Sequence, residues 1–145
     1  MNNILLAKII SYKTHQGQLD KGGMAYYKHP VRIAKNFKDK KLKILALLHD
    51  VLEDGDINIL DLNKNFSSDV LEALTAITRD INTEYMDYIK TVAKNQMARA
   101  VKIADLKDNM DLTRLKIIKA NDIKRTYKYL EALNYLIAID AKEVK

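Results

Sequence analysis

Apolar residues recur with a helical period along nearly the whole chain. They follow one face over residues 4–12 and again over 31–37, where the single proline, Pro30, fits the first turn of a helix. Residues 42–52 are almost uniformly apolar, which indicates a helix buried on all sides. Further helices are expected from about Asn58, after a cap at Ser68 or Asp69, and over residues 83–94, 96–112 and 121–142. Because no stretch alternates long enough to form a strand, the pattern predicts an all-α fold of about seven helices.

Composition supports a single compact domain spanning residues 1–145. The chain is 48% apolar and 30% charged, which is typical of a globular protein. Four glycines and one proline are too few for the turns of an all-β chain. The absence of cysteine excludes a disulfide scaffold, a thiolate zinc site and a cysteine nucleophile.

The same features bear on location and partners. A chain without cysteine suits a reducing cytoplasm, and the N-terminus has no basic leader, so we expect a cytoplasmic protein. The longest apolar run, residues 44–48, is far too short to span a membrane. A formal charge of +6 favours anionic partners such as nucleotides, nucleic acid or phosphate-rich surfaces. The five lysines within residues 35–43 form either a solvated helix end or a phosphate-binding patch.

The segment LLHDVLED places ionisable residues directly after the most apolar run. Burial of His49 and Asp50 there is costly unless they are paired or bind a metal. On a helix, His49 shares a face with Glu53, and Asp50 shares one with Asp54, because each pair is four residues apart. His49 and Asp50 can therefore converge on one ion, while Glu53 and Asp54 offer a candidate general base.

A second acidic cluster lies in VKIADLKDNMDL. Asp105 follows a buried apolar stripe and is expected to point inward, with Asn109 one turn further on the same face. His29 directly precedes the proline and is expected to be extended. Two imidazoles and two carboxylates suit Mn²⁺ or Fe²⁺. The plainer alternatives are a histidine–aspartate pair that arose by chance and an Asp105 that only pairs with Lys102 or Lys107.

Three ordered motifs, KTHQGQLDKGGMAYYKHPVRIA, ALLHDVLED and VKIADLKDNMD, carry a family resemblance. The chain resembles the HD-domain metal-dependent phosphohydrolases from about Ala7 to Leu136. Within them it is similar to the alarmone hydrolases, both the small stand-alone enzymes and the hydrolase half of bifunctional synthetase/hydrolases. Because 145 residues suffice for this domain alone, we expect a hydrolase without a synthetase segment.

The resemblance implies roles for three sets of residues. The family's metal ligands, usually around Mn²⁺, match His29, His49, Asp50 and Asp105. The acidic pair that orients or deprotonates the attacking water matches Glu53 and Asp54. Substrate contacts match Lys21, Asn109, Arg125 and Tyr129, with Arg79 as a further candidate for phosphate. Arg125 and Tyr129 are also four residues apart, so they share a helix face. Two residues that simply lie on the exposed surface of the helix would show the same spacing.

The chain departs from the family pattern near the first motif. Asp20 stands where alarmone hydrolases typically carry an arginine that stacks on guanine, and a carboxylate cannot make that contact. Gly55 replaces a common threonine, and Leu-Lys-Asp follows Asp105 in place of Arg-Leu-His. No direct metal contact is implied for His15, for which a hydrogen bond or a loop anchor is expected.

Together these features predict an Mn²⁺-dependent phosphohydrolase, with removal of the 3′-pyrophosphate of guanosine tetra- or pentaphosphate as the first choice. Other phosphorylated nucleotides stay open as substrates, namely the 2′-phosphate of NADPH and nucleoside mono- or triphosphates. The alternative from another class is a non-catalytic basic helical module that binds nucleic acid, which is the less favoured reading. The sequence leaves self-association open.

Overall fold

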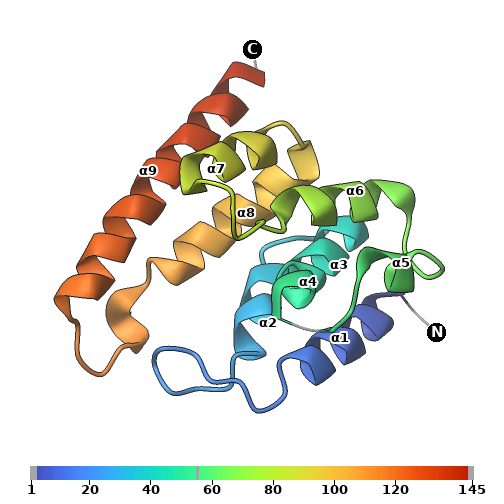
Figure 1. Cartoon of the computed structure of the whole chain (residues 1–145), viewed down its shortest axis with the longest axis horizontal. Helices are drawn as coiled ribbons and strands as arrows, with labels where there is room; N and C mark the ends of the chain where they lie inside the picture. Colours follow the sequence, from blue (N-terminus) through green and yellow to red (C-terminus); the bar gives the residue numbers. More distant parts are fainter. Residues whose placement is uncertain (1–2, 55, 144–145) are drawn as a thin grey trace.

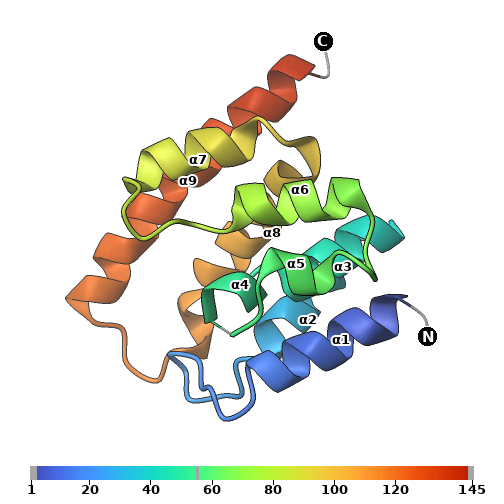
Figure 2. The same ribbon diagram turned by 45° about the vertical axis from the view of Figure 1, so that its right-hand side comes forward.

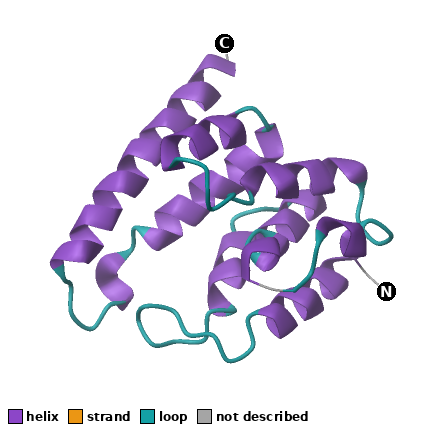
Figure 3. Cartoon of the chain, in the orientation of Figure 1, coloured by secondary structure: helices purple, strands orange, loops and turns teal. Residues whose placement is uncertain are grey.

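The structure, a computed structural model, describes residues 3–54 and 56–143, with the side chain of Asp54 left out. Its helices are α1 (Asn3–Thr14), α2 (Lys28–Ala34), α3 (Lys40–Leu48), α4 (Val51–Asp54), α5 (Ile59–Leu62), α6 (Ser68–Ile77), α7 (Tyr85–Ala93), α8 (Gln96–Asn109), the 3₁₀ turn η1 (Leu112–Arg114) and α9 (Ala120–Glu143). Figure 3 shows helices and loops but no strand in these ranges. A lone antiparallel bridge joins Leu19 to Ala25. The predicted all-α fold is confirmed, because every stretch expected to be helical contains a helix in the described ranges.

Helices α3 and α8 lie at the centre of the bundle. Helix α3 packs against α1, α2, α6 and α8, and α8 also packs against α2, α7 and α9 (Figure 1). All five residues from Ile44 to Leu48 are buried, as the uniformly apolar run predicts. Turning the molecule shows α9 along one side of the bundle and α1 near the opposite side (Figure 2).

Polar caps set the beginnings of several helices. The side chains of Asp39, Asn58 and Asn95 each accept a hydrogen bond from a backbone N–H in the first turn of α3, α5 and α8. Helix α6 begins at Ser68, so its N-cap is Ser67, one residue before the predicted cap. The sequence therefore locates these starts to within a residue or two.

Helix α2 begins earlier than the proline suggests. His29 lies inside α2 instead of being extended, so that expectation is wrong. Pro30 is the third residue of the helix, where its missing N–H needs no intrahelical partner. Short turns precede it: the N–H of Lys28 donates to the carbonyl of Ala25, and the N–H of His29 donates to that of Tyr26.

The predicted helix over residues 42–52 is interrupted. Helix α3 ends at Leu48, His49 follows it in right-handed helical geometry, and the short helix α4 begins at Val51. The break falls on His49 and Asp50, the adjacent polar pair within this stretch. Their side chains face partners on other helices, described below.

A buried arginine joins α8 to α9. The side chain of Arg99 is only 2% exposed, and its Nε donates to Oδ1 of Asp140 over 2.5 Å. Its two terminal nitrogens donate to Glu143 and to the carbonyl of Ala93.

Across residues 3–54 and 56–143, no helix combines the length and apolar content needed to cross a bilayer.

Candidate metal centre

Two histidines and two aspartates converge where α2, α3 and α8 meet. Oδ1 of Asp105 lies 2.8 Å from Nε2 of His29 and 3.3 Å from Nε2 of His49. Oδ2 of Asp50 lies 3.1 Å from Nε2 of His49 and 3.9 Å from Nε2 of His29. The structure thus brings together all four residues that the sequence singles out as candidate ligands.

These side chains offer a ligand set to a cation. One potential ligand atom from each of His29, His49 and Asp105 lies within 4.8 Å of the other two, and all three residues are buried. Asp50 stands beside them with a side chain 16% exposed, so the cluster opens on that side. Imidazole and carboxylate ligands in this combination suit a divalent ion of intermediate hardness.

Hydrogen bonding assigns the tautomers of both rings. Nδ1 of His49 lies 2.6 Å from the carbonyl oxygen of Ala46, and Nδ1 of His29 lies 2.6 Å from Oδ2 of Asp108. Since both partners only accept, each Nδ1 carries the proton and each Nε2 faces the two carboxylates. Within the described chain, Nε2 of His49 is buried and forms no hydrogen bond. A cation between the rings and the carboxylates would satisfy this nitrogen, so the residues present fit a metal.

The pKa values of the four residues show that the cluster favours positive charge beside its carboxylates. Burial by itself would lower the pKa of both histidines, but the neighbouring carboxylates raise the pKa of His29 above 6.5 and that of His49 well above it. Burial opposes ionisation of Asp50, yet His49 lowers the pKa of Asp50 to about 2. The pKa of Asp105 is also well below its usual value, because Lys102 and both histidines outweigh its burial.

Asp105 also forms the ion pair with Lys102 that the plainer interpretation of the sequence expects. Nζ of Lys102 donates to Oδ2 of Asp105 over 2.8 Å, whereas Oδ1 of the same carboxylate faces the histidines and accepts from Nδ2 of Asn109 over 3.0 Å. The two roles use different oxygen atoms. Pairing with Lys102 therefore leaves one oxygen directed at the histidines.

Sequence reasoning missed two side chains that hold this cluster. The hydroxyl of Tyr26 donates to Oδ2 of Asp50, and the carboxylate of Asp108 accepts from His29. Asp108 also pairs with Arg32, which lies three residues after His29, just as Asp108 lies three after Asp105. This shared i,i+3 spacing was the signal available in the sequence.

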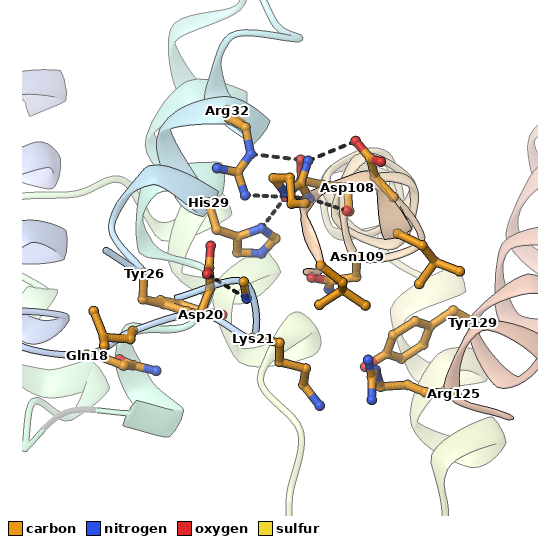
Figure 4. A pocket seen from close by; sticks show the side chains of 16 residues that line it. Gln18, Asp20, Lys21, Tyr26, His29, Arg32, Asp108, Asn109, Arg125 and Tyr129 are labelled. Atoms are coloured by element: carbon orange, nitrogen blue, oxygen red, sulfur yellow. Dashed lines mark hydrogen bonds and ion pairs between the residues drawn. The ribbon is translucent and has the colours of Figure 1, made fainter. Parts of the chain in front are cut away.

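A cavity of about 280 Å³ adjoins the cluster on the side of η1 and α9. Lys21, Asn109, Arg125 and Tyr129 all line it, and Figure 4 shows them around one space with His29. NH2 of Arg125 donates to Asp122 over 2.6 Å. The four residues matched to substrate contacts are therefore brought together, with Lys21 coming from the loop before α2 and Arg125 and Tyr129 from α9.

A second cavity of about 180 Å³ shares Asn109 and Tyr129 with the first. His49, Asp50, Glu53 and Arg79 line it. Oε1 of Glu53 accepts from the backbone N–H of Arg79 over 2.6 Å. The side chain of Asp54 lies outside the described part, as does Gly55. Arg79 thus faces a different cavity from Lys21 and Arg125.

The lysines of residues 35–43 take no part in either cavity as far as the described residues define them. Lys41 pairs with the exposed Asp69 over 2.5 Å, and Nζ of Lys43 donates to the carbonyl of Ala34. These contacts fit the solvated helix end better than the phosphate-binding patch.

Asp20 shapes the loop that carries Lys21. Its Oδ1 accepts from the backbone N–H groups of Gly22 and Met24, each over 2.9 Å. A Cβ at Gly22 would lie 2.5 Å from the carbonyl oxygen of Arg114, so the loop needs glycine to approach η1. His15 is buried at the start of this loop, with Nδ1 2.9 Å from Oε1 of Gln18. Asp20 and His15 both act on the loop's conformation.

Comparison with known proteins supports the predicted resemblance. The guanosine-3′,5′-bis(diphosphate) 3′-pyrophosphohydrolase of Vibrio cholerae is 31% identical over 91 residues, 60% of this chain and 13% of the relative. The enzyme of the same name from Borreliella burgdorferi is 30% identical over 123 residues, 74% of this chain and 18% of the relative. The Drosophila melanogaster enzyme MESH1 is 35% identical over 77 residues, 50% of this chain and 43% of the relative. The chain therefore spans less than half the length of these curated relatives, and no family model matches it.

A solved structure has the same fold. A metazoan ortholog of SpoT, described as hydrolysing ppGpp, superposes with a TM-score of 0.79 over 94% of this chain and 85% of its own, at 22% identity. Sequence relatives and fold together confirm the predicted resemblance to alarmone hydrolases.

Proposed function

We propose that this chain, which resembles the HD-domain alarmone hydrolases in sequence and fold, is a metal-dependent guanosine-3′,5′-bis(diphosphate) 3′-pyrophosphohydrolase. The observation that carries the proposal is the convergence of His29, His49, Asp50 and Asp105, with both Nε2 atoms directed at the carboxylates. The names of the relatives supply the substrate class. We take residues 1–145 as one hydrolase domain acting in the cytoplasm.

His29, His49, Asp50 and Asp105 would hold one divalent ion, for which we propose Mn²⁺, with Fe²⁺ as the nearest alternative by ligand chemistry. When bound, such an ion polarises a phosphoryl oxygen and stabilises the charge that develops on it. Tyr26 orients the carboxylate of Asp50, and Lys102 holds the far oxygen of Asp105. The ligands are therefore restrained before the ion arrives.

Glu53 is the proposed acceptor for a proton of the attacking water. It lines the same cavity as His49 and Asp50, and its Oε1 is oriented by the N–H of Arg79. The water oxygen would bond to the phosphorus on the 3′-oxygen, that P–O bond would break, and pyrophosphate would leave as the 3′-oxygen gains a proton. Asp54 is assigned to assist Glu53 from the family resemblance alone.

Lys21, Asn109, Arg125 and Tyr129 are the proposed nucleotide contacts, because they line one cavity beside the metal ligands. Arg79 would contact phosphate from the second cavity, where its guanidinium lies 5.2 Å from the ring centre of Tyr85. Cations in these places complement a substrate with phosphate groups at two ends.

One observation favours a second candidate within the same reaction class. Asp20 is engaged with the backbone of its own loop and offers no surface on which guanine could stack. A nucleotide with a different base, such as NADPH with its 2′-phosphate, or a nucleoside mono- or triphosphate, is therefore the alternative substrate.

The test is a nucleotide panel with purified protein and Mn²⁺. We expect release of pyrophosphate from guanosine tetraphosphate, its loss with EDTA, and its loss in Asp50→Ala. The matched control, Glu72→Gln, changes an exposed carboxylate on α6 and should keep full activity. Turnover of NADPH alone would favour the alternative substrate. Nucleic-acid binding that weakens steeply with salt and ignores EDTA would replace the proposal by the binding module.

A further inference from the structure

Asp108 lies on α8 three residues after Asp105, and its side chain is 15% exposed. It lines the cavity that Lys21 and Arg125 also line, where Figure 4 shows it beside Arg32 and His29. Neither the sequence motifs nor the family resemblance assigns it a role, and it occupies a position at which the chain departs from the family pattern.

The contact with His29 is direct. Oδ2 of Asp108 accepts from Nδ1 of His29 over 2.6 Å, while the opposite ring nitrogen, Nε2, lies 2.8 Å from Asp105. Asp105 and Asp108, one turn apart on α8, therefore contact the two ring nitrogens of His29 on α2. The contact with Asp108 keeps a proton on Nδ1, so Nε2, which faces Asp105, is the nitrogen whose lone pair a bound cation would take.

Two arginines hold the Asp108 carboxylate in place. Nε and NH2 of Arg32 donate to Oδ1 and Oδ2 of Asp108, each over 3.0 Å, which is a bidentate arrangement. NH2 of Arg114 donates to the backbone carbonyl of Asp108 over 2.6 Å and lies 3.3 Å from Oδ2. The carboxylate is therefore held in one orientation by His29 and two arginines.

We propose that Asp108 is a positioning residue that orients His29 as a metal ligand, with Arg32 and Arg114 as its supports. The inference rests on the metal centre of the proposed function and is independent of which nucleotide is hydrolysed. In this proposal Arg32 and Arg114 hold Asp108 and do not bind the substrate's phosphate groups. Carboxylates that hold a ligating histidine in this way contribute about 10- to 100-fold to metal affinity or activity.

The test measures Mn²⁺ binding directly, from the loss of the free-ion paramagnetic resonance signal, with no nucleotide present. We expect Asp108→Ala to weaken binding about 10- to 100-fold and Asp108→Asn, which keeps an acceptor without the charge, to weaken it less. The matched control is Asp111→Asn, because Asp111 pairs with Arg114 over 2.9 Å and, within the described chain, forms no hydrogen bond or ion pair with His29. The control should bind Mn²⁺ as the unchanged protein does.

A second readout follows the ring proton itself. In the metal-free protein labelled with ¹⁵N-histidine, the Nδ1 proton of His29 should give a protected downfield signal that Asp108→Ala abolishes and Asp111→Asn retains. Folded Asp108→Ala with unchanged Mn²⁺ affinity would overturn the proposal. If Asp108→Ala does not fold, the isosteric Asp108→Asn decides, and unchanged affinity there overturns it equally.

The outcomes separate this inference from the proposed function. If the unchanged protein binds no Mn²⁺, the proposed metal centre and this role of Asp108 fail together. If Mn²⁺ binding depends on Asp108 while guanosine tetraphosphate is not hydrolysed, the positioning role stands and only the substrate assignment fails.

Discussion

The hydroxyl of Tyr26 donates a hydrogen bond to Oδ2 of Asp50, the same oxygen that lies 3.1 Å from Nε2 of His49. Tyr26 comes from the loop before α2 and Asp50 from the turn between α3 and α4, so the bond links the loop to the candidate metal centre. The loop also carries Lys21, which lines the adjoining cavity. Loop conformation and ligand geometry are thereby coupled.

Removal of this hydroxyl should weaken metal binding. We expect Tyr26→Phe to lower Mn²⁺ affinity by about tenfold, because a hydrogen bond to a charged group contributes about 1.5 kcal/mol or more. Tyr27→Phe is the control, since the Tyr27 ring packs edge-on against Tyr12 at 5.3 Å, away from the cluster. The measurement is a calorimetric Mn²⁺ titration. Equal affinities for Tyr26→Phe and the unchanged protein would contradict the coupling.

Metal removal should lower stability. Only the folded chain brings His29, His49, Asp50 and Asp105 together, so a cation at 100 times its dissociation constant should add about 2.7 kcal/mol to the free energy of unfolding. For a chain of this length that corresponds to a rise of about 8 °C in the thermal midpoint. Differential scanning calorimetry with Mn²⁺ and with EDTA checks this. An Asp50→Ala variant should show little of the rise; a full rise in that variant would argue against the site.

Gly22 should not tolerate a side chain. In Gly22→Ala the new Cβ would lie 2.5 Å from the carbonyl oxygen of Arg114, so the loop or η1 must move. We expect a loss of about 1–3 kcal/mol in stability and, because Lys21 is adjacent, a raised KM for the nucleotide. Met24→Ala, at a half-exposed side chain of the same loop, should change neither. Steady-state kinetics and urea unfolding test both parts, and an unaltered KM would separate the loop from substrate binding.

Arg99 should matter for stability alone. Its buried guanidinium links Asp140, Glu143 and the carbonyl of Ala93, so Arg99→Met leaves these acceptors to water and loosens α9 against α8. We expect a loss of about 1.5–3 kcal/mol in the free energy of unfolding, measured in urea, because hydrogen bonds of a charged group are lost. The control is Lys142→Ala, a change of an exposed residue on α9. A change in Mn²⁺ affinity that exceeds the change in stability would show that α9 acts on the metal centre.

The local chemistry of the chain accounts for most of the fold. Helical periodicity predicts the long elements, since side chains three and four residues apart must share a face, and caps such as Asn95 mark their beginnings. The exceptions lie at the candidate site. Neither the helical conformation of His29 nor the break between α3 and α4 follows from local preference, because partners on α8 and in the loop before α2 hold these residues.

From the sequence alone one could propose the four candidate ligands and the nucleotide-contacting residues, because motif order and residue type carry that information. Which oxygen of Asp105 faces the histidines, which nitrogen of His29 faces Asp105, and which arginines contact Asp108 depend on contacts between residues up to 79 positions apart in the chain. Arg79 and Lys21 likewise line different cavities, which share Asn109 of α8 and Tyr129 of α9. Periodicity and composition act over one or two turns of helix, whereas these pairings arise when separate helices pack, so only the tertiary structure decides them.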